Sequence, residues 1–248
     1  MVGVYARRAE LLQALAEQFP EQVHIYPLDV RDAAAQQAAA ADFIARVGTP
    51  DIVIANAGVS IGTLTHYAED NEVFRHVMDI NVLGAVQTFQ PFLDAMRDAG
   101  RGHPSPQSSP ASGRGSKREK HFTLVGIASV AGFRGLPGSG AYSASKAALI
   151  SYLESLRQEL RGSGVKVVTI CPGYIRTPMT DINPYPMPFM LEADEAARRI
   201  ARVIERGCSF KVVPWQMGVV GGLLKLLPNW LFDLAFAKVK RKPRGTLS

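Results

Sequence analysis

The residues with the clearest capacity for chemistry are Tyr142 and Lys146, in the segment Tyr-Ser-Ala-Ser-Lys. Positions four apart share one face of a helix, so the lysine ammonium can lie near the tyrosine phenol. A neighbouring cation favours the phenolate and lowers the pKa of a tyrosine below its ordinary value of about 10. The pair is therefore predicted to act as a general acid or base at neutral pH, with Tyr142 exchanging the proton.

Ser129 precedes Tyr142 by thirteen residues and stands at the end of a predicted strand. From there its hydroxyl can bind the same substrate oxygen as the tyrosine. A tyrosine and a lysine at this spacing also occur on exposed helices without any chemical role, so the pair alone does not establish a site. The surrounding elements and their motifs decide between the two interpretations.

Short apolar and β-branched runs alternate with longer segments of helical periodicity. The runs that predict strands are Val2–Tyr5, Val23–Leu28, Asp51–Ala55, Phe122–Ala128, Val165–Cys171 and Phe210–Val213. The segments that predict helices are Arg8–Phe19, Asp32–Val47, Asn71–Arg97, Ser143–Arg161 and Ala193–Arg206. Several of the strands are apolar nearly throughout, as expected of parallel strands that are covered on both faces.

This alternation predicts the α/β fold class, with a doubly wound, Rossmann-like parallel sheet in a three-layer α/β/α arrangement. Ligands of such sheets bind at the carboxyl ends of the strands. We expect one domain over residues 1–248, with a flexible inserted loop at about 102–120 and C-terminal helices and a basic tail over about 214–248.

Six motifs follow one another along these elements. They are Asp29-Val30 after one strand, Asn56-Ala57-Gly58 after the next, Asn81 within a long predicted helix, Ser129, the Tyr142/Lys146 pair, and Pro172-Gly173 with Ile175 and Thr177 after a further strand. In this order the chain resembles the short-chain dehydrogenase/reductase family of NAD(P)-dependent oxidoreductases. The resemblance covers nearly the whole chain apart from the loop at about 102–120.

The resemblance implies a catalytic role for four residues. Ser129 would orient the substrate carbonyl and Tyr142 would transfer the proton. Lys146 would also bind the nicotinamide ribose, and Asn81 would hold a water in a proton relay to Lys146.

The resemblance also implies three groups of cofactor-binding residues. Asp29 and Val30 would lie beside the adenine ring, and Asn56, Ala57 and Gly58 would let the backbone approach the cofactor ribose. Pro172, Gly173, Ile175 and Thr177 would line the nicotinamide end. Taken singly, Asn56-Ala57-Gly58 can be only a tight turn and Pro172-Gly173 only a strand terminator.

One motif of the family has no counterpart in the sequence. The loop Thr-Gly-x-x-x-Gly-x-Gly, which lets the pyrophosphate approach the first helix, is missing, and Met1 falls where the family's second strand begins. Without the first strand and first helix, the sheet should expose ladder groups and apolar surface. Three explanations for the missing unit remain open. The sequence is a fragment or has a misplaced start codon, the protein has diverged and no longer turns over a substrate, or another element or chain replaces the unit.

The charge after the first predicted strand bears on the choice of cofactor. An acidic residue after the second strand of a dinucleotide fold binds the ribose 2′-hydroxyl of NAD, whereas an arginine accommodates the 2′-phosphate of NADP. Here Arg7 and Arg8 follow the strand, and the first acidic residue is Glu10. NADP(H) is therefore predicted in preference to NAD(H).

The formal charge of +6 invites a nucleic-acid partner, but the charge is unevenly placed. Residues 101–120 and 238–248 together carry more positive charge than the whole chain, so the remaining body is mildly acidic. The first stretch is rich in Gly, Pro and Ser and contains no Phe, Tyr or Trp to stack on a base. A solvated loop is expected there, and no nucleic-acid partner is predicted.

Composition limits the other function classes. The two cysteines are too few for a disulfide framework, and the five histidines show no metal-ligand spacing, so no metal site is predicted. No signal peptide or membrane-spanning segment is evident, and a cytoplasmic location is expected. The apolar segment before the basic tail would form helices packed on the body or on a second subunit, or would make a weak peripheral contact with an anionic membrane surface.

The leading hypothesis is an oxidoreductase that moves a hydride between NADP(H) and a small-molecule carbonyl or alcohol. The apolar residues of the segment after Thr177 either favour an apolar substrate or merely pack that segment; they are Met179, Tyr185, Met187, Phe189 and Met190. The rival hypothesis is a catalytically silent binding or scaffold protein, or an inactive fragment, that lacks the pyrophosphate loop. The family's usual pairing through the long helices at about 71–97 and 143–161 further predicts a homodimer or homotetramer.

Overall fold

A computed structural model describes residues 1–101, 122–181, 186–239 and 241–246, so the loop predicted at about 102–120 lies outside the described residues. The strands are β1 (Val2–Ala6), β2 (Val23–Pro27), β3 (Ile52–Ala55), β4 (Phe122–Ile127), β5 (Val165–Pro172) and β6 (Phe210–Val213). The helices are α1 (Ala9–Gln18), α2 (Ala33–Val47), α3 (Asp70–Met78), α4 (Gly84–Arg101), α5 (Gly140–Glu159), α6 (Pro178–Asp181), α7 (Ala193–Glu205), α8 (Trp215–Leu226) and α9 (Asn229–Phe236). The predicted alternation of strands and helices is confirmed, with bounds that shift by a few residues.

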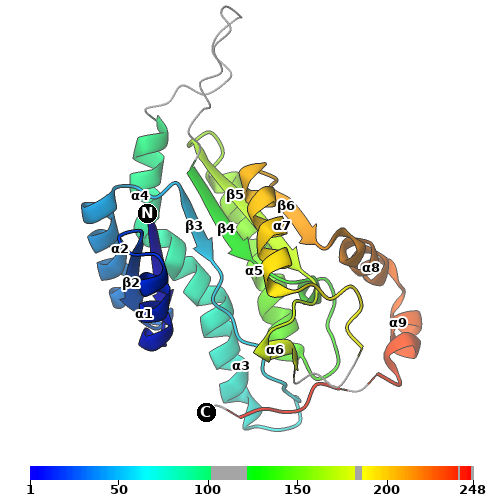
Figure 1. Cartoon of the computed structure of the whole chain (residues 1–248). Helices are drawn as coiled ribbons and strands as arrows, with labels where there is room; N and C mark the ends of the chain where they lie inside the picture. Colours follow the sequence, from blue (N-terminus) through cyan, green and yellow to red (C-terminus); the bar gives the residue numbers. More distant parts are fainter. Residues whose placement is uncertain (102–121, 182–185, 240, 247–248) are drawn as a thin grey trace, which may run out of the picture.

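The strands pair in two separate sheets, and every pair is parallel. β1 pairs with β2, while β3, β4, β5 and β6 pair in that order. Helices flank the larger sheet on both faces, which confirms the predicted doubly wound α/β class (Figure 1). Among the described residues, no hydrogen-bonded ladder joins β1 to β3.

The strand β3 is covered on one face only. Val53 and Ala55 are buried, whereas Ile52 and Ile54 are each 46% exposed. Parallel strands are ordinarily covered on both faces, so this bare apolar face is unusual. Together with the edges that β1 and β3 leave unpaired, it matches the exposure expected of a sheet that is interrupted at this point.

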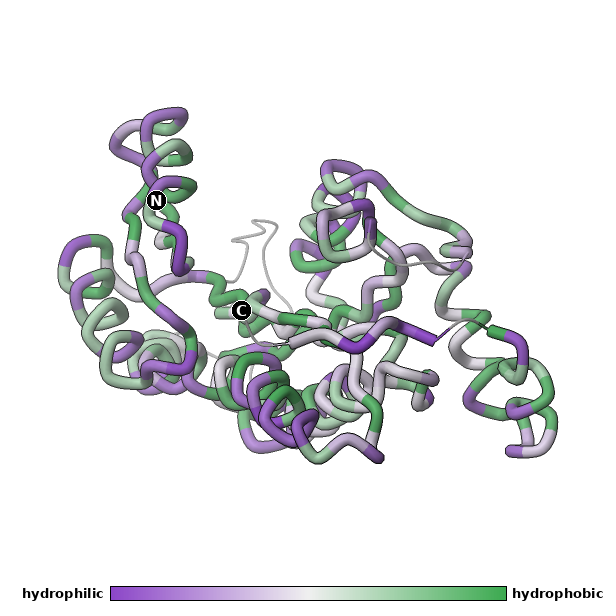
Figure 2. Tube along the Cα trace, turned by 90° about the horizontal axis from the view of Figure 1, so that it is seen from below, coloured by the Kyte–Doolittle hydropathy of each residue, from purple (hydrophilic) through white to green (hydrophobic). Residues whose placement is uncertain are grey.

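Two clusters of buried side chains hold the larger sheet between its helices. The main cluster lies under α4 and α5 and includes Phe89, Met96 and Leu153. On the opposite face, Val203 and Ile204 of α7 pack against β4 and β5. Along these helices hydrophobic and hydrophilic stretches alternate (Figure 2), as expected where one side of a helix faces a core. The packing fixes the carboxyl ends of β4 and β5, where the predicted site residues lie.

The helix predicted over Asn71–Arg97 is interrupted, so the expectation of one continuous helix was wrong. α3 ends at Met78, a π-helical turn spans Asp79–Leu83, and α4 begins at Gly84. Turns of this kind are frequent at functional sites. Asn81 lies in the turn and is fully buried.

The described part of the basic tail folds back onto the body. Lys242 is buried, and its Nζ donates to the carbonyl and hydroxyl oxygens of Ser60 at 2.9 and 2.6 Å. Arg244 forms an ion pair with buried Asp70, at 2.7 Å between Nη2 and Oδ1, and its guanidinium lies 3.5 Å from the centre of the Tyr67 ring. These two cations therefore hold the segment that follows β3 in place.

Candidate active site

Ser129, Tyr142 and Lys146 come together beyond the carboxyl end of β4. Ser129 follows that strand, and the other two residues lie one turn apart near the start of α5. The hydroxyl groups of Ser129 and Tyr142 form a hydrogen bond. The Nζ atom of Lys146 lies 5.8 Å from the centre of the Tyr142 ring. The structure thus assembles three of the four predicted catalytic side chains in one place.

Gly132 permits this close approach, although the sequence did not single it out. Ser129 begins a short 3-10 turn, Val130–Gly132, and its hydroxyl accepts a hydrogen bond from the N–H of Ala131 at 3.2 Å. A Cβ at Gly132 would lie 2.7 Å from the backbone carbonyl carbon of Lys146, which is closer than unbonded atoms approach. Only glycine therefore lets the turn that begins at Ser129 rest on α5.

Burial governs the protonation of Tyr142 and Lys146. It raises the pKa of the Tyr142 phenol, and the hydrogen bond with Ser129 opposes this only in part. It also lowers the pKa of Lys146 to about 8. The prediction that Lys146 lowers the pKa of Tyr142 was wrong for this arrangement, because the Lys146 Nζ donates to the carbonyl of Ile127 at 2.8 Å and desolvation of the phenol dominates.

Asn81 is held by neighbouring groups on both sides of its amide. Its Oδ1 accepts from the N–H of Val59 at 2.8 Å, and its Nδ2 donates to the carbonyl of Val59 and to the hydroxyl of Ser145, both at 2.9 Å. The two bonds to Val59 fix the backbone directly after Asn56-Ala57-Gly58. A Cβ on Gly58 would lie 3.3 Å from the Asn81 Oδ1 and 3.4 Å from the Lys146 Nζ, so these groups crowd the same corner.

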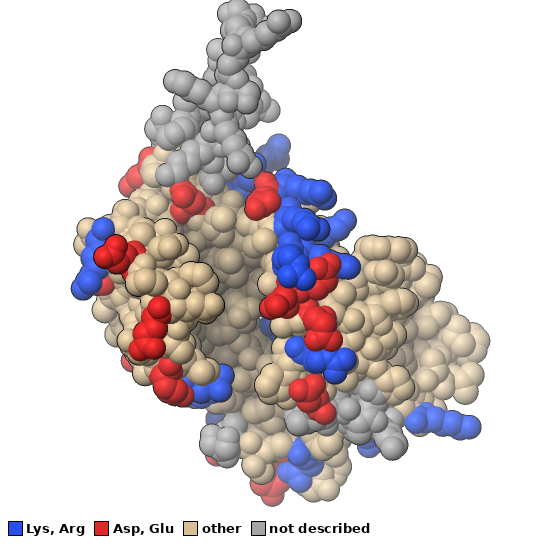
Figure 3. Space-filling view, viewed as in Figure 1, with Lys and Arg blue, Asp and Glu red and all other residues tan. Residues whose placement is uncertain are grey.

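The assembled residues border a cleft of about 930 Å³ that runs between β1 and β3. Figure 3 shows this hollow in the viewed face. Every predicted site residue except Asn81 lines it; these are Arg7, Arg8, Asp29, Val30, Asn56, Ala57, Gly58, Ser129, Tyr142, Lys146, Pro172, Gly173, Ile175 and Thr177. Residues that are far apart in the sequence thus share one cavity, which also includes Ile52 and Ile54 of the exposed β3 face, between the unpaired edges of β1 and β3.

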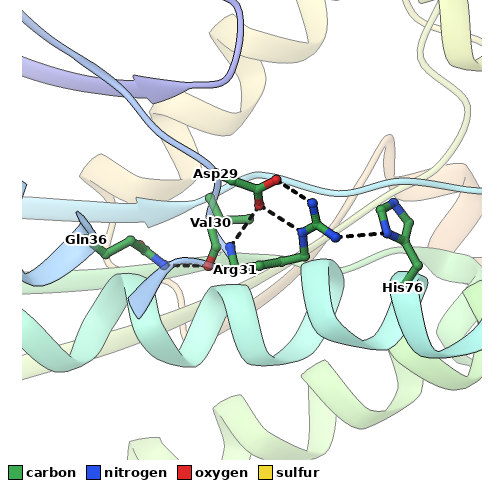
Figure 4. Close-up of polar contacts among 5 residues, drawn as sticks. All are labelled: Asp29, Val30, Arg31, Gln36 and His76. Carbon is green, nitrogen blue, oxygen red and sulfur yellow. Dashed lines mark hydrogen bonds and ion pairs between the residues drawn. The ribbon is translucent and has the colours of Figure 1, made fainter. Parts of the chain in front are cut away.

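At one end of the cleft, Asp29 is held by Arg31 (Figure 4). Asp29 accepts from the Arg31 backbone N–H at 2.9 Å and forms a 2.7 Å ion pair with its guanidinium, and these contacts lower the pKa of Asp29 to about 2. The carbonyl of Val30 accepts from the Gln36 side chain at 2.7 Å. Arg31 also approaches the His76 ring, with 3.3 Å between Nη1 and Nδ1. This end of the cleft is therefore fixed by side-chain contacts.

Arg7 and Arg8 border the cleft directly after β1, and both are exposed. Arg8 occupies the position before the first turn of α1. A helix N-terminus and two guanidinium groups make this edge of the cleft electropositive.

The other end of the cleft is formed by the chain after β5. Pro172, Gly173, Ile175 and Thr177 line it, and the short helix α6 continues the wall. The sequence reasoning missed Thr180, whose hydroxyl donates to the carbonyl of Ile175 at 2.8 Å and accepts from the N–H of Thr177 at 2.9 Å. A threonine three residues after another threonine was the available signal for such a turn.

Cys171 lies behind these residues and is fully buried. Burial raises the pKa of its thiol to about 12, so the thiolate that a nucleophile requires is not formed at neutral pH. Within the described part of the chain, no group of three or more His, Cys, Asp or Glu side chains could hold a metal ion. The chemistry that this cleft offers is proton transfer between a hydroxyl pair and a substrate oxygen.

A family model described as short chain dehydrogenase matches residues 1–184 of the chain. An uncharacterized oxidoreductase of Myxococcus xanthus (strain DK1622) is 38% identical over 246 residues, which cover 96% of this chain and 88% of that protein. The 2-dehydro-3-deoxy-L-rhamnonate dehydrogenase (NAD(+)) of Sphingomonas sp. (strain SKA58) is 31% identical over 200 residues, which cover 77% of this chain and 72% of that protein.

Solved structures share the fold. A short-chain dehydrogenase from Streptomyces avermitilis has a TM-score of 0.68 and 25% identity, with coverage of 96% of this chain and 88% of that one. A short chain dehydrogenase from Burkholderia cenocepacia J2315, solved in complex with NADP, has a TM-score of 0.72 and 21% identity, with coverage of 94% and 84%.

Proposed function

The chain belongs to the short-chain dehydrogenase family of oxidoreductases, and from this premise we propose that it transfers a hydride between NADP(H) and a small-molecule carbonyl or alcohol. The observation that carries the proposal is the hydrogen-bonded pair Ser129 and Tyr142, with Lys146 beside it, at the wall of a cleft that the candidate cofactor-binding residues also line. A neutral hydroxyl pair at that place suits proton delivery to a carbonyl oxygen.

The residues of the cleft fit the two ends of a nicotinamide dinucleotide. Lys146, Asn56 and Thr177 would hold the nicotinamide and its ribose, and Asp29 and Val30 would lie beside the adenine. Three glycines line the cleft among the described residues, and Gly3, Gly58 and Gly173 come from separate segments rather than from one glycine-rich loop. The fit is thus to the ends of the cofactor, and the described part of the chain places no counterpart of the family's pyrophosphate loop between them.

Each side chain has a definite task in the proposed reaction. A nicotinamide cofactor, when bound, supplies the hydride that adds to the carbonyl carbon. Ser129 donates a hydrogen bond that orients the carbonyl oxygen, and Tyr142 donates its phenolic proton to that oxygen, so that the product is an alcohol. Because burial raises the pKa of Tyr142, the residue holds this proton at neutral pH.

After each turnover, Lys146 and Asn81 would help to return a proton to Tyr142. With a pKa of about 8, Lys146 can release a proton near neutral pH far more readily than an exposed lysine. We propose that Asn81 acts mainly as a positioning residue, since its amide is occupied by Val59 and Ser145, and that a relay water would contact Lys146 beside it.

We propose an apolar carbonyl or alcohol as the substrate class. Met179 lines the cleft, and Met179 and Phe189 are 40% and 50% exposed in the segment after Thr177. Tyr185 lies outside the described residues.

We also propose a homodimer or homotetramer that pairs through the segments 71–97 and 143–161. Within the first of these segments, Phe74 and Leu83 are 41% and 51% exposed.

One structural observation favours a second candidate, a catalytically silent binding protein of the same family. The cleft opens between unpaired strand edges, and Ile52 and Ile54 of the exposed β3 face form part of its lining. Cofactor titration of the 248-residue chain separates the two candidates. Binding of NADPH together with carbonyl reduction supports the oxidoreductase, whereas the absence of both supports the silent protein.

The cofactor preference is a separate expectation. The relatives include a protein named for NAD(+) and one solved with NADP, but the guanidinium groups of Arg7 and Arg8 favour the 2′-phosphate. We expect NADPH to bind at least about 10-fold more tightly than NADH, measured as dissociation constants by fluorescence titration.

Replacing both arginines, Arg7→Ser with Arg8→Ser, should remove most of this preference and weaken NADH binding little. Arg206→Ser is the matched control, since Arg206 is exposed and lies outside the cleft lining. Equal or tighter binding of NADH by the unaltered chain would show that the predicted cofactor is wrong.

A further inference from the structure

The helices α8 and α9 expose large apolar side chains that the proposed reaction does not use. Their exposed fractions lie between 52% and 82%, and the residues are Trp215, Val219, Leu223, Leu226, Trp230 and Leu234. Within each helix they recur every three or four residues, which is the period of one helix face. Figure 3 shows mainly uncharged surface over α8 and α9. We call these six residues the outer stripe.

The opposite side of the two helices is firmly attached to the body. Met217 and Phe232 are buried. Arg134 donates from Nη1 to the carbonyls of Leu224 and Leu227 at 2.9 and 2.6 Å, and its guanidinium lies 4.2 Å from the centre of the Phe232 ring. The outer stripe is therefore not part of the hydrophobic core of the chain. It is presented outward by helices whose inner side is already packed.

Six large, exposed apolar side chains on two consecutive helices indicate a contact with something other than water. Soluble proteins tolerate single exposed apolar residues, whereas contiguous patches indicate a partner or a membrane. Two of the six residues are tryptophans, which favour the boundary between lipid headgroups and acyl chains because the ring is apolar and the indole N–H is polar.

The charges around the outer stripe distinguish an anionic membrane from a second copy of the chain. Lys225 is exposed within α8, and Lys238 and Arg241 are exposed just after α9, whereas the segment 215–241 contains a single acidic residue, Asp233. A two-fold dimer sets a surface against its own copy, so it would bring these cations together. Anionic lipid headgroups would instead attract them.

We propose that the outer stripe docks onto the surface of a membrane that contains anionic lipids. The six apolar side chains would enter the headgroup boundary, and Lys225, Lys238 and Arg241 would contact lipid phosphates. No helix among the described residues is long and apolar enough to cross a membrane, and shallow docking requires none. This proposal is independent of the oxidoreductase activity.

The chain carries its own reporter for this contact. It contains two tryptophans, Trp215 and Trp230, and both belong to the outer stripe. The full chain is titrated with vesicles of phosphatidylcholine alone and with vesicles that also contain phosphatidylglycerol. We expect the phosphatidylglycerol vesicles to shift tryptophan emission to shorter wavelength and to protect it from acrylamide. We expect at least about 10-fold weaker binding to phosphatidylcholine alone, because about 1 kcal/mol is gained for each cation at an anionic surface.

Two variants test whether the outer stripe, rather than another part of the surface, causes vesicle binding. Leu226→Asn with Leu234→Asn should weaken vesicle binding at least about 100-fold, because the variant loses two leucine side chains that would be buried in the membrane on docking. The matched control is Leu11→Asn, which alters a residue of α1 that is 51% exposed outside the outer stripe. Both altered surfaces are exposed, so neither variant should change the far-ultraviolet circular dichroism.

Three results would overturn the proposal. The first is unchanged tryptophan emission with both kinds of vesicle, and the second is equal loss of binding in the Leu11 control. The third is a dimer in sedimentation velocity, without lipid, that becomes a monomer in the Leu226/Leu234 variant. In that case the outer stripe would be an interface between copies of the chain.

Discussion

Tyr142→Phe is expected to lower kcat/KM for NADPH-dependent carbonyl reduction by about 1,000-fold, within the range that general acid catalysis contributes. The substitution removes the phenolic proton and leaves the ring, which is half-buried beside Ser129. Steady-state oxidation of NADPH in the presence of a ketone or aldehyde measures the change. The dissociation constant of NADPH should stay almost unchanged, because the proposed cofactor contacts of Lys146 and Thr177 would remain.

Tyr152→Phe is the matched control for this substitution. Tyr152 lies on the same helix, α5, and packs against the main core cluster rather than at the cleft. It should retain nearly full activity. If Tyr142→Phe also retained activity while folded, Tyr142 would not be the proton donor and the proposed mechanism would be wrong.

Lys146→Met is expected to raise the free energy of unfolding at pH 7 while it abolishes turnover. Burial lowers the pKa of Lys146 from 10.5 to about 8, so the charged amine reduces the free energy of unfolding of the chain at pH 7. That difference corresponds to about 3 kcal/mol, and loss of the bond to the Ile127 carbonyl reduces the expected gain to about 2 kcal/mol. Urea unfolding of the unaltered chain and the variant measures it.

The sign of the pH dependence follows from the direction of this shift. Because the pKa is lower in the folded chain, the unfolded chain binds more protons between about pH 8 and pH 10.5. The penalty from Lys146 is therefore fully present below pH 8 and disappears as the pH rises toward 10.5. The advantage of Lys146→Met should shrink accordingly between pH 7 and pH 9.5.

Lys166→Met supplies the comparison for this stability measurement. Lys166 is exposed on β5, so its replacement should change the free energy of unfolding by less than about 0.5 kcal/mol at either pH. A destabilised Lys146→Met variant, or an advantage that is the same at both pH values, would contradict the assignment of a desolvated ammonium to Lys146.

Much of the fold was predictable because the local sequence of most strands and helices has the apolar pattern of that element. The apolar run at Val165–Cys171 and the periodic segment at Ala193–Arg206 correspond closely to β5 and α7. Since parallel strands place their carboxyl ends at one edge, the residues after them could be expected to meet. The common cleft of Ser129, Tyr142 and Lys146 confirms that they do.

The features that escaped prediction depend on contacts between distant parts of the chain. The ion pair of Arg244 with Asp70 joins residues that are 174 positions apart in the sequence. No local sequence pattern predicts that a basic tail will fold back onto the body of the chain. The π-helical turn around Asn81 coincides with hydrogen bonds of its side chain with Val59 and Ser145, which the apolar spacing of the segment does not reveal. The direction of the Tyr142 pKa shift required knowledge of its burial, which the spacing to Lys146 cannot supply.

The interruption between β1 and β3 has a direct bearing on function. The cleft that holds the predicted site residues is bordered by the unpaired edges of both sheets. A cofactor bound there would contact residues from each side, including Arg8 and Tyr142. Cofactor binding is therefore expected to stabilise the arrangement of the two sheets as well as to enable the reaction, since a ligand that binds only the folded chain adds to its stability.

The central claim is hydride transfer within this cleft, and isotopic labelling tests it most directly. The 248-residue chain is incubated with NADPH that carries deuterium at the reactive nicotinamide carbon and with a panel of apolar aldehydes and ketones. Mass spectrometry then follows the alcohol product. The proposed function predicts an alcohol with one deuterium on its carbinol carbon, formed by the unaltered chain about 1,000-fold faster than by Tyr142→Phe. Alcohol without deuterium, or no alcohol from any member of the panel, would contradict it.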